Sequence, residues 1–93
     1  MDDRTAAETL ALQALGWVFG QEELVPQFLA ATGAAPQDMA RLAGDAQFLG
    51  AVLDFLLTED ALVIGFCDAQ GLAYDRPMRA RALLPGGPGP HWT

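Results

Sequence analysis

The chain has 93 residues, of which 52% are hydrophobic and 18% are charged, so it has material for one core and no room for a second domain. Twelve acids against five arginines give a formal net charge of −7, which disfavours nucleic acid as a partner. One cysteine, Cys67, cannot form an internal disulfide, and no clustered cysteine or histidine suggests a metal ligand set or a cofactor. The acidic N-terminus and the lack of a membrane-length apolar run favour a cytoplasmic protein without a membrane segment.

The first predicted helix covers about residues 6–19. Thr5 and Glu8 have the spacing of a capping box, and apolar residues then recur at helical period until Gly20. The side of this helix that faces solvent is expected to hold Thr9, Gln13 and Gly16.

A second helix is predicted to end at Gly33, and its start depends on Pro26. Proline is tolerated only in the first turn, so the helix either kinks at Pro26 or begins near Val25. A short third helix is predicted over about 36–43, because Pro36 suits a first helical position and Gly44 suits a helix end.

Two further helices are predicted in the middle of the chain. Asp45 should cap the first, over about 46–57, and Thr58 the second, over about 59–70, which closes at Gly71. Cys67 shares the apolar face of the second helix, and we expect it to be an inert core thiol.

The last predicted helix covers about 76–84, with Pro77 in its first turn, and a Pro/Gly-rich tail follows over 85–93. No alternating strand pattern is present. The sequence therefore predicts the all-α class: a compact bundle of five to six short helices forming a single helical domain over 1–84, followed by the tail.

Asp54 is the only acid within the apolar run FLGAVLDFLL. On a helix it shares one narrow strip with Gln47 and Gly50, at spacings of seven and four residues. This strip is either the edge of a central helix that meets water or a groove in which Asp54 anchors a partner's arginine or a backbone donor. Catalysis is disfavoured, because a general acid or base needs a second positioned group and the sequence suggests none.

Charge is distributed unevenly along the chain. Residues 72–85 carry three arginines, Arg76, Arg79 and Arg81, against one acid, whereas residues 1–71 carry two arginines against eleven acids. The three arginines can dock on the acidic body of the protein itself or simply be solvated, receive an acidic or phosphorylated partner, or contact nucleic acid. In the tail, Trp92 is a candidate apolar anchor on the same chain or on a partner, and the remaining alternative is that it docks nowhere.

The segment GDAQFLGAVLDFLL, with the terminal His91 and Trp92, resembles a family of small bacterial proteins catalogued as Domain of Unknown Function 3572. The most specific positions are Gly44, Asp45, Phe48, Leu49, Val52, Leu53, Asp54, Phe55 and Leu56. The resemblance implies a small cytoplasmic helical protein and no particular mechanism.

From these patterns we expect a non-enzymatic protein–protein interaction module, either monomeric or homodimeric. The alternatives are a homodimeric structural subunit, an enzyme that acts on a small molecule, and a nucleic-acid binder. We assign no catalytic, cofactor-binding or metal-binding residue. The candidate partner-binding residues are Asp54, Arg76, Arg79, Arg81 and Trp92.

Overall fold

The protein is an all-α bundle, as the sequence predicts. A computed structural model describes residues 2–86, and within that range every regular element is helical. In chain order the elements are α1 (Asp3–Phe19), α2 (Val25–Thr32), the 3-10 turn η1 (Pro36–Asp38), α3 (Met39–Leu42), α4 (Ala46–Leu57), α5 (Asp60–Gln70) and α6 (Arg76–Ala82). None of the helices in the described range is long and apolar enough to cross a membrane.

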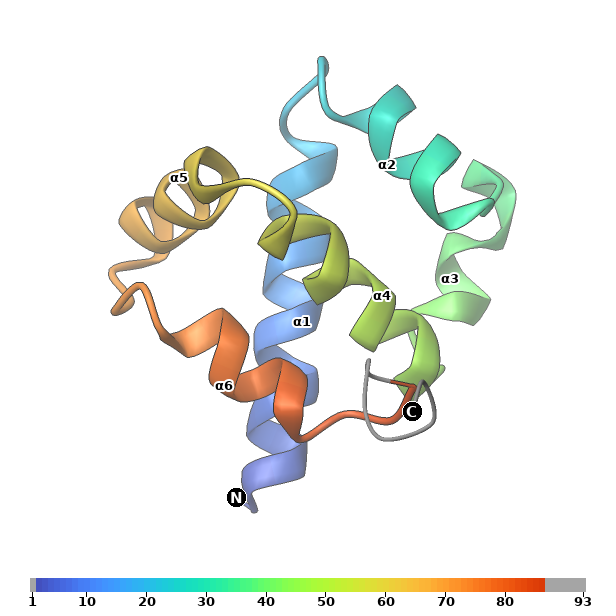
Figure 1. The fold of residues 1–93 in the computed structure, drawn as a ribbon. Coiled ribbons are helices and arrows are strands. Elements are labelled where there is room, and N and C mark those ends of the chain that lie inside the picture. The colour runs from blue at the N-terminus through green and yellow to red at the C-terminus, as the bar shows by residue number, and fades with distance from the viewer. Residues whose placement is uncertain (1, 87–93) are drawn as a thin grey trace, which may run out of the picture.

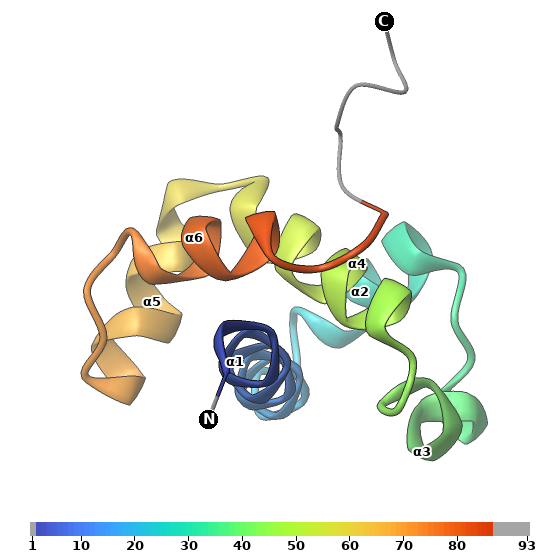
Figure 2. The ribbon, with the colours of Figure 1, turned by 90° about the horizontal axis from the view of Figure 1, so that it is seen from below.

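The helices pack around α1 and α4. Helices α4 and α6 lie side by side on the same side of α1, and both contact it (Figures 1 and 2). Helix α4 also contacts α2 and α5, so it touches four of the other helices. This central position explains its nearly uniform apolar sequence, since most of its circumference is buried.

An aromatic cluster joins α2 to α4. Phe28 of α2 is fully buried, and its ring meets the rings of Phe19, Phe48 and Phe55 edge to face, with centroids 5.3 to 6.0 Å apart. Edge-to-face pairs place the positive ring edge on the negative face of the neighbour, so they add specificity to the burial of apolar area.

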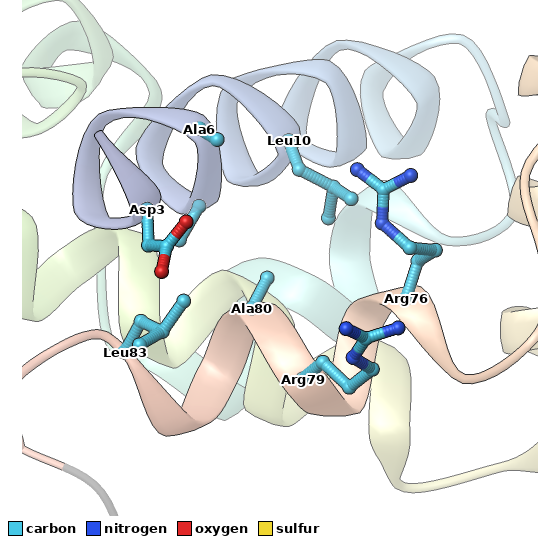
Figure 3. A pocket seen from close by; sticks show the side chains of 8 residues that line it. Asp3, Ala6, Leu10, Arg76, Arg79, Ala80 and Leu83 are labelled. Carbon is cyan, nitrogen blue, oxygen red and sulfur yellow. The ribbon is translucent and has the colours of Figure 1, made fainter. Parts of the chain in front are cut away.

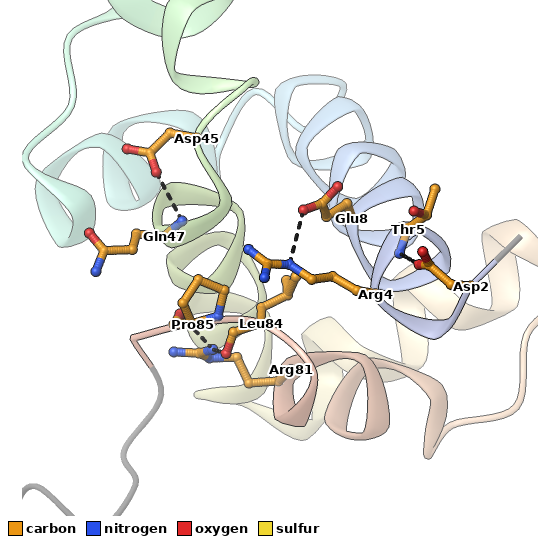
Figure 4. Close-up of polar contacts among 9 residues, drawn as sticks. All are labelled: Asp2, Arg4, Thr5, Glu8, Asp45, Gln47, Arg81, Leu84 and Pro85. Carbon is orange, nitrogen blue, oxygen red and sulfur yellow. Dashed lines mark hydrogen bonds and ion pairs between the residues drawn. The ribbon is translucent and has the colours of Figure 1, made fainter.

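Several helix ends lie where the sequence predicts them. Helix α4 spans Ala46–Leu57, and the Asp45 carboxylate accepts a hydrogen bond from the Gln47 backbone N–H at 3.0 Å (Figure 4). Helix α2 begins at Val25 with proline in its first turn, so no kink is needed, and it ends at Gly33 in the left-handed conformation with φ of 72°. The solvent side predicted for α1 is also confirmed, because Thr9, Gln13 and Gly16 are exposed.

The predicted start of α1 was wrong. The helix begins at Asp3, because the Asp2 carboxylate accepts the Thr5 backbone N–H at 2.7 Å and takes the capping role assigned to Thr5 (Figure 4). The same hydrogen bond lowers the pKa of the Asp2 carboxyl. An aspartate three residues ahead of a donor caps as well as a threonine, so the capping-box pattern alone did not separate the two starts.

Three other predicted boundaries also change. Thr58 does not cap α5, since its hydroxyl donates to the Phe55 carbonyl at 2.6 Å and Glu59 occupies the position before the helix. The stretch predicted as one helix over 36–43 begins as the 3-10 turn η1 before α3. Helix α6 ends at Ala82, two residues earlier than expected.

We predict that Leu53→Ala lowers the free energy of unfolding by about 2–5 kcal/mol, because the side chain of this α4 residue is fully buried and its loss leaves a cavity. Leu12→Ala is the matched control, since the same change occurs at a side chain that is 43% exposed on α1. Urea denaturation measures both. Equal losses in the two variants would contradict the central position of α4.

Candidate functional site

Asp54 on α4 and Arg81 on α6 form a two-point ion pair. The Arg81 Nε donates to Asp54 Oδ1 at 2.6 Å, and Nη2 donates to Oδ2 at 3.2 Å. The Arg81 side chain is only 7% exposed, whereas that of Asp54 is 48% exposed. The carboxylate therefore closes the outer side of a buried guanidinium.

The remaining nitrogen of Arg81 binds the chain that leaves α6. Nη1 donates to the Leu84 carbonyl at 3.1 Å and to the Pro85 carbonyl at 3.3 Å (Figure 4). Each of the three guanidinium nitrogens has at least one acceptor, so its burial leaves no nitrogen without a partner. Arg81 thus ties α4, α6 and residues 84–85 together.

Gly50 makes room for this arrangement. A Cβ atom at position 50 would lie 2.8 Å from Nη1 of Arg81 and 3.0 Å from the Pro85 carbonyl oxygen. The strip that periodicity assigned to Gln47, Gly50 and Asp54 is therefore open to water only in part. Gln47 and Asp54 are exposed, and Gly50 is buried beneath the guanidinium.

A groove lies between the N-terminal half of α1 and α6. Its volume is about 310 Å³, and Figure 3 shows its side chains coming from both helices. It is lined by Asp3, Ala6, Ala7 and Leu10 of α1, by Arg76, Arg79 and Ala80 of α6, and by Leu83. The alanines form a small-residue floor, and the charged groups stand at its ends and rim.

Arg76 and Arg79 differ from Arg81 in being exposed. Arg79 contacts Asp75, the residue just before α6, at 3.6 Å, and this exposed pair is of little energetic value. Arg76 forms no ion pair with any residue in the range 2–86. Of the three C-terminal arginines, one is therefore used internally and two face the groove.

Large apolar side chains are exposed around α6. Met78 is 60% exposed, and Tyr74 and Leu83, just before and just after the helix, are also exposed. The Tyr74 hydroxyl donates to Asp68 at 2.7 Å, and this hydrogen bond raises the pKa of Tyr74. We call Tyr74, Arg76, Met78, Arg79 and Leu83 the α6 surface.

Cys67 lies in the core, as predicted. It is fully buried, and burial is the main reason why the pKa of its thiol is raised. Its Sγ atom is 3.5 Å from the Ala73 carbonyl oxygen, to which it can donate. Among residues 2–86, no three histidine, cysteine, aspartate or glutamate side chains gather where they could hold a metal ion.

Trp92, the last of the candidate partner-binding residues, lies outside the described residues. The other four candidates separate into two places. Asp54 and Arg81 pair with each other, and Arg76 and Arg79 line the groove.

Comparison with known protein families shows which family the chain belongs to. The model of the family described as protein of unknown function (DUF3572) matches residues 4–87, which is most of the chain. The chain belongs to the DUF3572 family. No curated protein and no solved structure matches it.

Two features of this DUF3572 protein escaped the sequence reasoning. The first is the role of Gly50, for which the only signal was a glycine within an otherwise strong helix, a position that costs stability unless something packs closely against it. The second is Asp3, which sequence reasoning treated only as part of an acidic N-terminus. Its place in the groove follows from the packing of α1 against α6.

We predict that Gly50→Ala lowers the free energy of unfolding by about 1–3 kcal/mol, because the new methyl group meets Arg81 and the Pro85 carbonyl. Gly16→Ala is the control. At that exposed helical position a Cβ meets nothing within 4 Å, so alanine should stabilise the protein by up to about 1 kcal/mol. Urea denaturation of both variants measures whether the free energy of unfolding falls in Gly50→Ala and rises in Gly16→Ala. A stabilising Gly50→Ala would contradict the close approach of Arg81.

Proposed function

We propose that this protein is a non-enzymatic protein–protein interaction module of the cytoplasm and that the α6 surface is where it binds. The observation that carries the proposal is a groove lined by two exposed arginines and the exposed Leu83, with Tyr74 and Met78 exposed beside or on the same helix. Arginine, methionine and aromatic residues are enriched at protein interfaces, because they combine large apolar contact area with hydrogen bonding.

The internal use of Arg81 supports this assignment. Because Arg81 is fixed to Asp54, the opposite edge of α6 turns Arg76 and Arg79 toward the groove beside α1 (Figure 3). A short helix held in this way presents its exposed side chains in one orientation, which lowers the entropy lost when a partner binds. The acidic body of the protein disfavours nucleic acid as that partner.

We predict that a photo-crosslinking amino acid placed at Met78 captures a defined protein in the cell of origin, because this side chain is 60% exposed on the same helix as the two arginines. The same group placed at Gln13, exposed on α1, is the control. Arg76→Glu together with Arg79→Glu should remove the product formed from position 78. Mass spectrometry identifies the captured chain.

Capture from position 78 that is no stronger than capture from position 13 would contradict the proposal. Capture that persists when both arginines are reversed would also contradict it, since the two guanidiniums would then have no part in binding. Circular dichroism of the reversed variant shows whether its helices are intact.

A further inference from the structure

The groove between α1 and α6 is polarised along its length. Asp3 and Leu83 lie at one end, whereas Arg76 and Arg79 lie at the other (Figure 3). Ala6 and Ala80 lie between the two ends, where their small side chains leave the floor open. A ligand that matches this groove needs a cationic group facing Asp3 and an anionic group facing the two arginines.

A second copy of the chain supplies that pattern. A two-fold axis that lies in the plane of the interface and crosses the groove reverses one copy end for end. The acidic end of each groove then faces the basic end of the other, and the two contacts are identical by symmetry. Each Asp3 carboxylate then faces arginines of the other copy. An arginine can donate two parallel hydrogen bonds to one carboxylate.

We infer that the partner of the α6 surface is a second copy of this chain, docked so that Asp3 of each copy meets Arg76 and Arg79 of the other. This inference rests on the proposed function, because it names the occupant of the same surface. The exposed Leu83, which lines the groove, supplies apolar contact beside the charged pairs.

The groove limits the area that the two copies can bury against each other. The smaller specific interfaces bury about 600 Å² on each partner. That is about a ninth of the 5420 Å² of accessible surface described for this chain, and it needs the rim of the groove as well as its floor. The interface therefore lies at the small end of specific interfaces, and the population of the dimer depends on concentration.

Charge reversal tests the docking. Asp3→Arg places arginine opposite arginine in a dimer of that variant, and Arg76→Glu places glutamate opposite aspartate. Each variant alone should dimerise at least about tenfold more weakly than the unchanged protein, because like charges then meet twice. An equimolar mixture of the two should regain dimerisation, since a mixed dimer pairs arginine with glutamate at one contact and with aspartate at the other. Sedimentation equilibrium measures all of these association constants.

Two control variants separate local contacts from net charge. Glu23→Arg and Arg41→Glu make the same charge changes at exposed positions outside the groove, on other elements. Both should dimerise within about threefold of the unchanged protein. Asp3→Arg also reduces the overall negative charge, which weakens the long-range repulsion between copies, so the loss predicted for it can come only from the local contact.

An unchanged protein that stays monomeric at every concentration would overturn the dimer, and so would a mixture that associates no better than its components. Crosslinking from position 78 then separates this failure from that of the proposed function. A crosslink to a different protein would leave the proposed function standing and overturn the second copy as occupant. A crosslink to residues 87–93 of the same chain would overturn both, because the tail would be the occupant.

Discussion

The burial of Arg81 is the constraint on which the placement of α6 depends. A guanidinium that is only 7% exposed cannot remain without acceptors, since an unpaired buried charge costs several kcal/mol. Asp54 and the carbonyls of Leu84 and Pro85 provide those acceptors, and they lie on α4 and on the chain that follows α6. Satisfying one side chain thus fixes the position of α6 against α4 and the path of the chain beyond it.

Small residues make this packing possible and also create the groove. Gly50 lets Arg81 cross α4 closely, and the buried alanines of α1, among them Ala11 and Ala14, let neighbouring helices approach its backbone. Where α1 and α6 meet, Ala7 and Ala80 are buried while they line the groove, so the small side chains leave space near the surface. Small residues therefore permit close packing in the core and also shape the candidate binding surface.

The all-α class and most helix positions could be predicted from the sequence, because apolar period and cap residues are local signals. The family was indicated by the resemblance of the segment GDAQFLGAVLDFLL. The bounds of α4 follow from Asp45 and the apolar run, and those of α2 from Pro26 and Gly33. The start of α1 could not be chosen locally, since two side chains offered equivalent caps. The pair between Asp54 and Arg81 spans 27 residues. Periodicity marks Asp54 as unusual but does not identify its partner. Arg76, Arg79 and Arg81 have the same side-chain chemistry, and only the packing of α6 places Arg81 beside Asp54.

Amide hydrogen exchange of Asp54→Ala is the measurement that tests most directly whether the Arg81 pair holds α6 in place. The variant should lose more protection in α6 and at the Leu84 amide than in α1 and α4, because the attachment of α6 is weakened most. Asp38→Ala is the control, since it removes an exposed contact to Arg41 at 3.6 Å and should change α6 little. Protection of α6 that is the same in Asp54→Ala as in the unchanged protein would contradict the account.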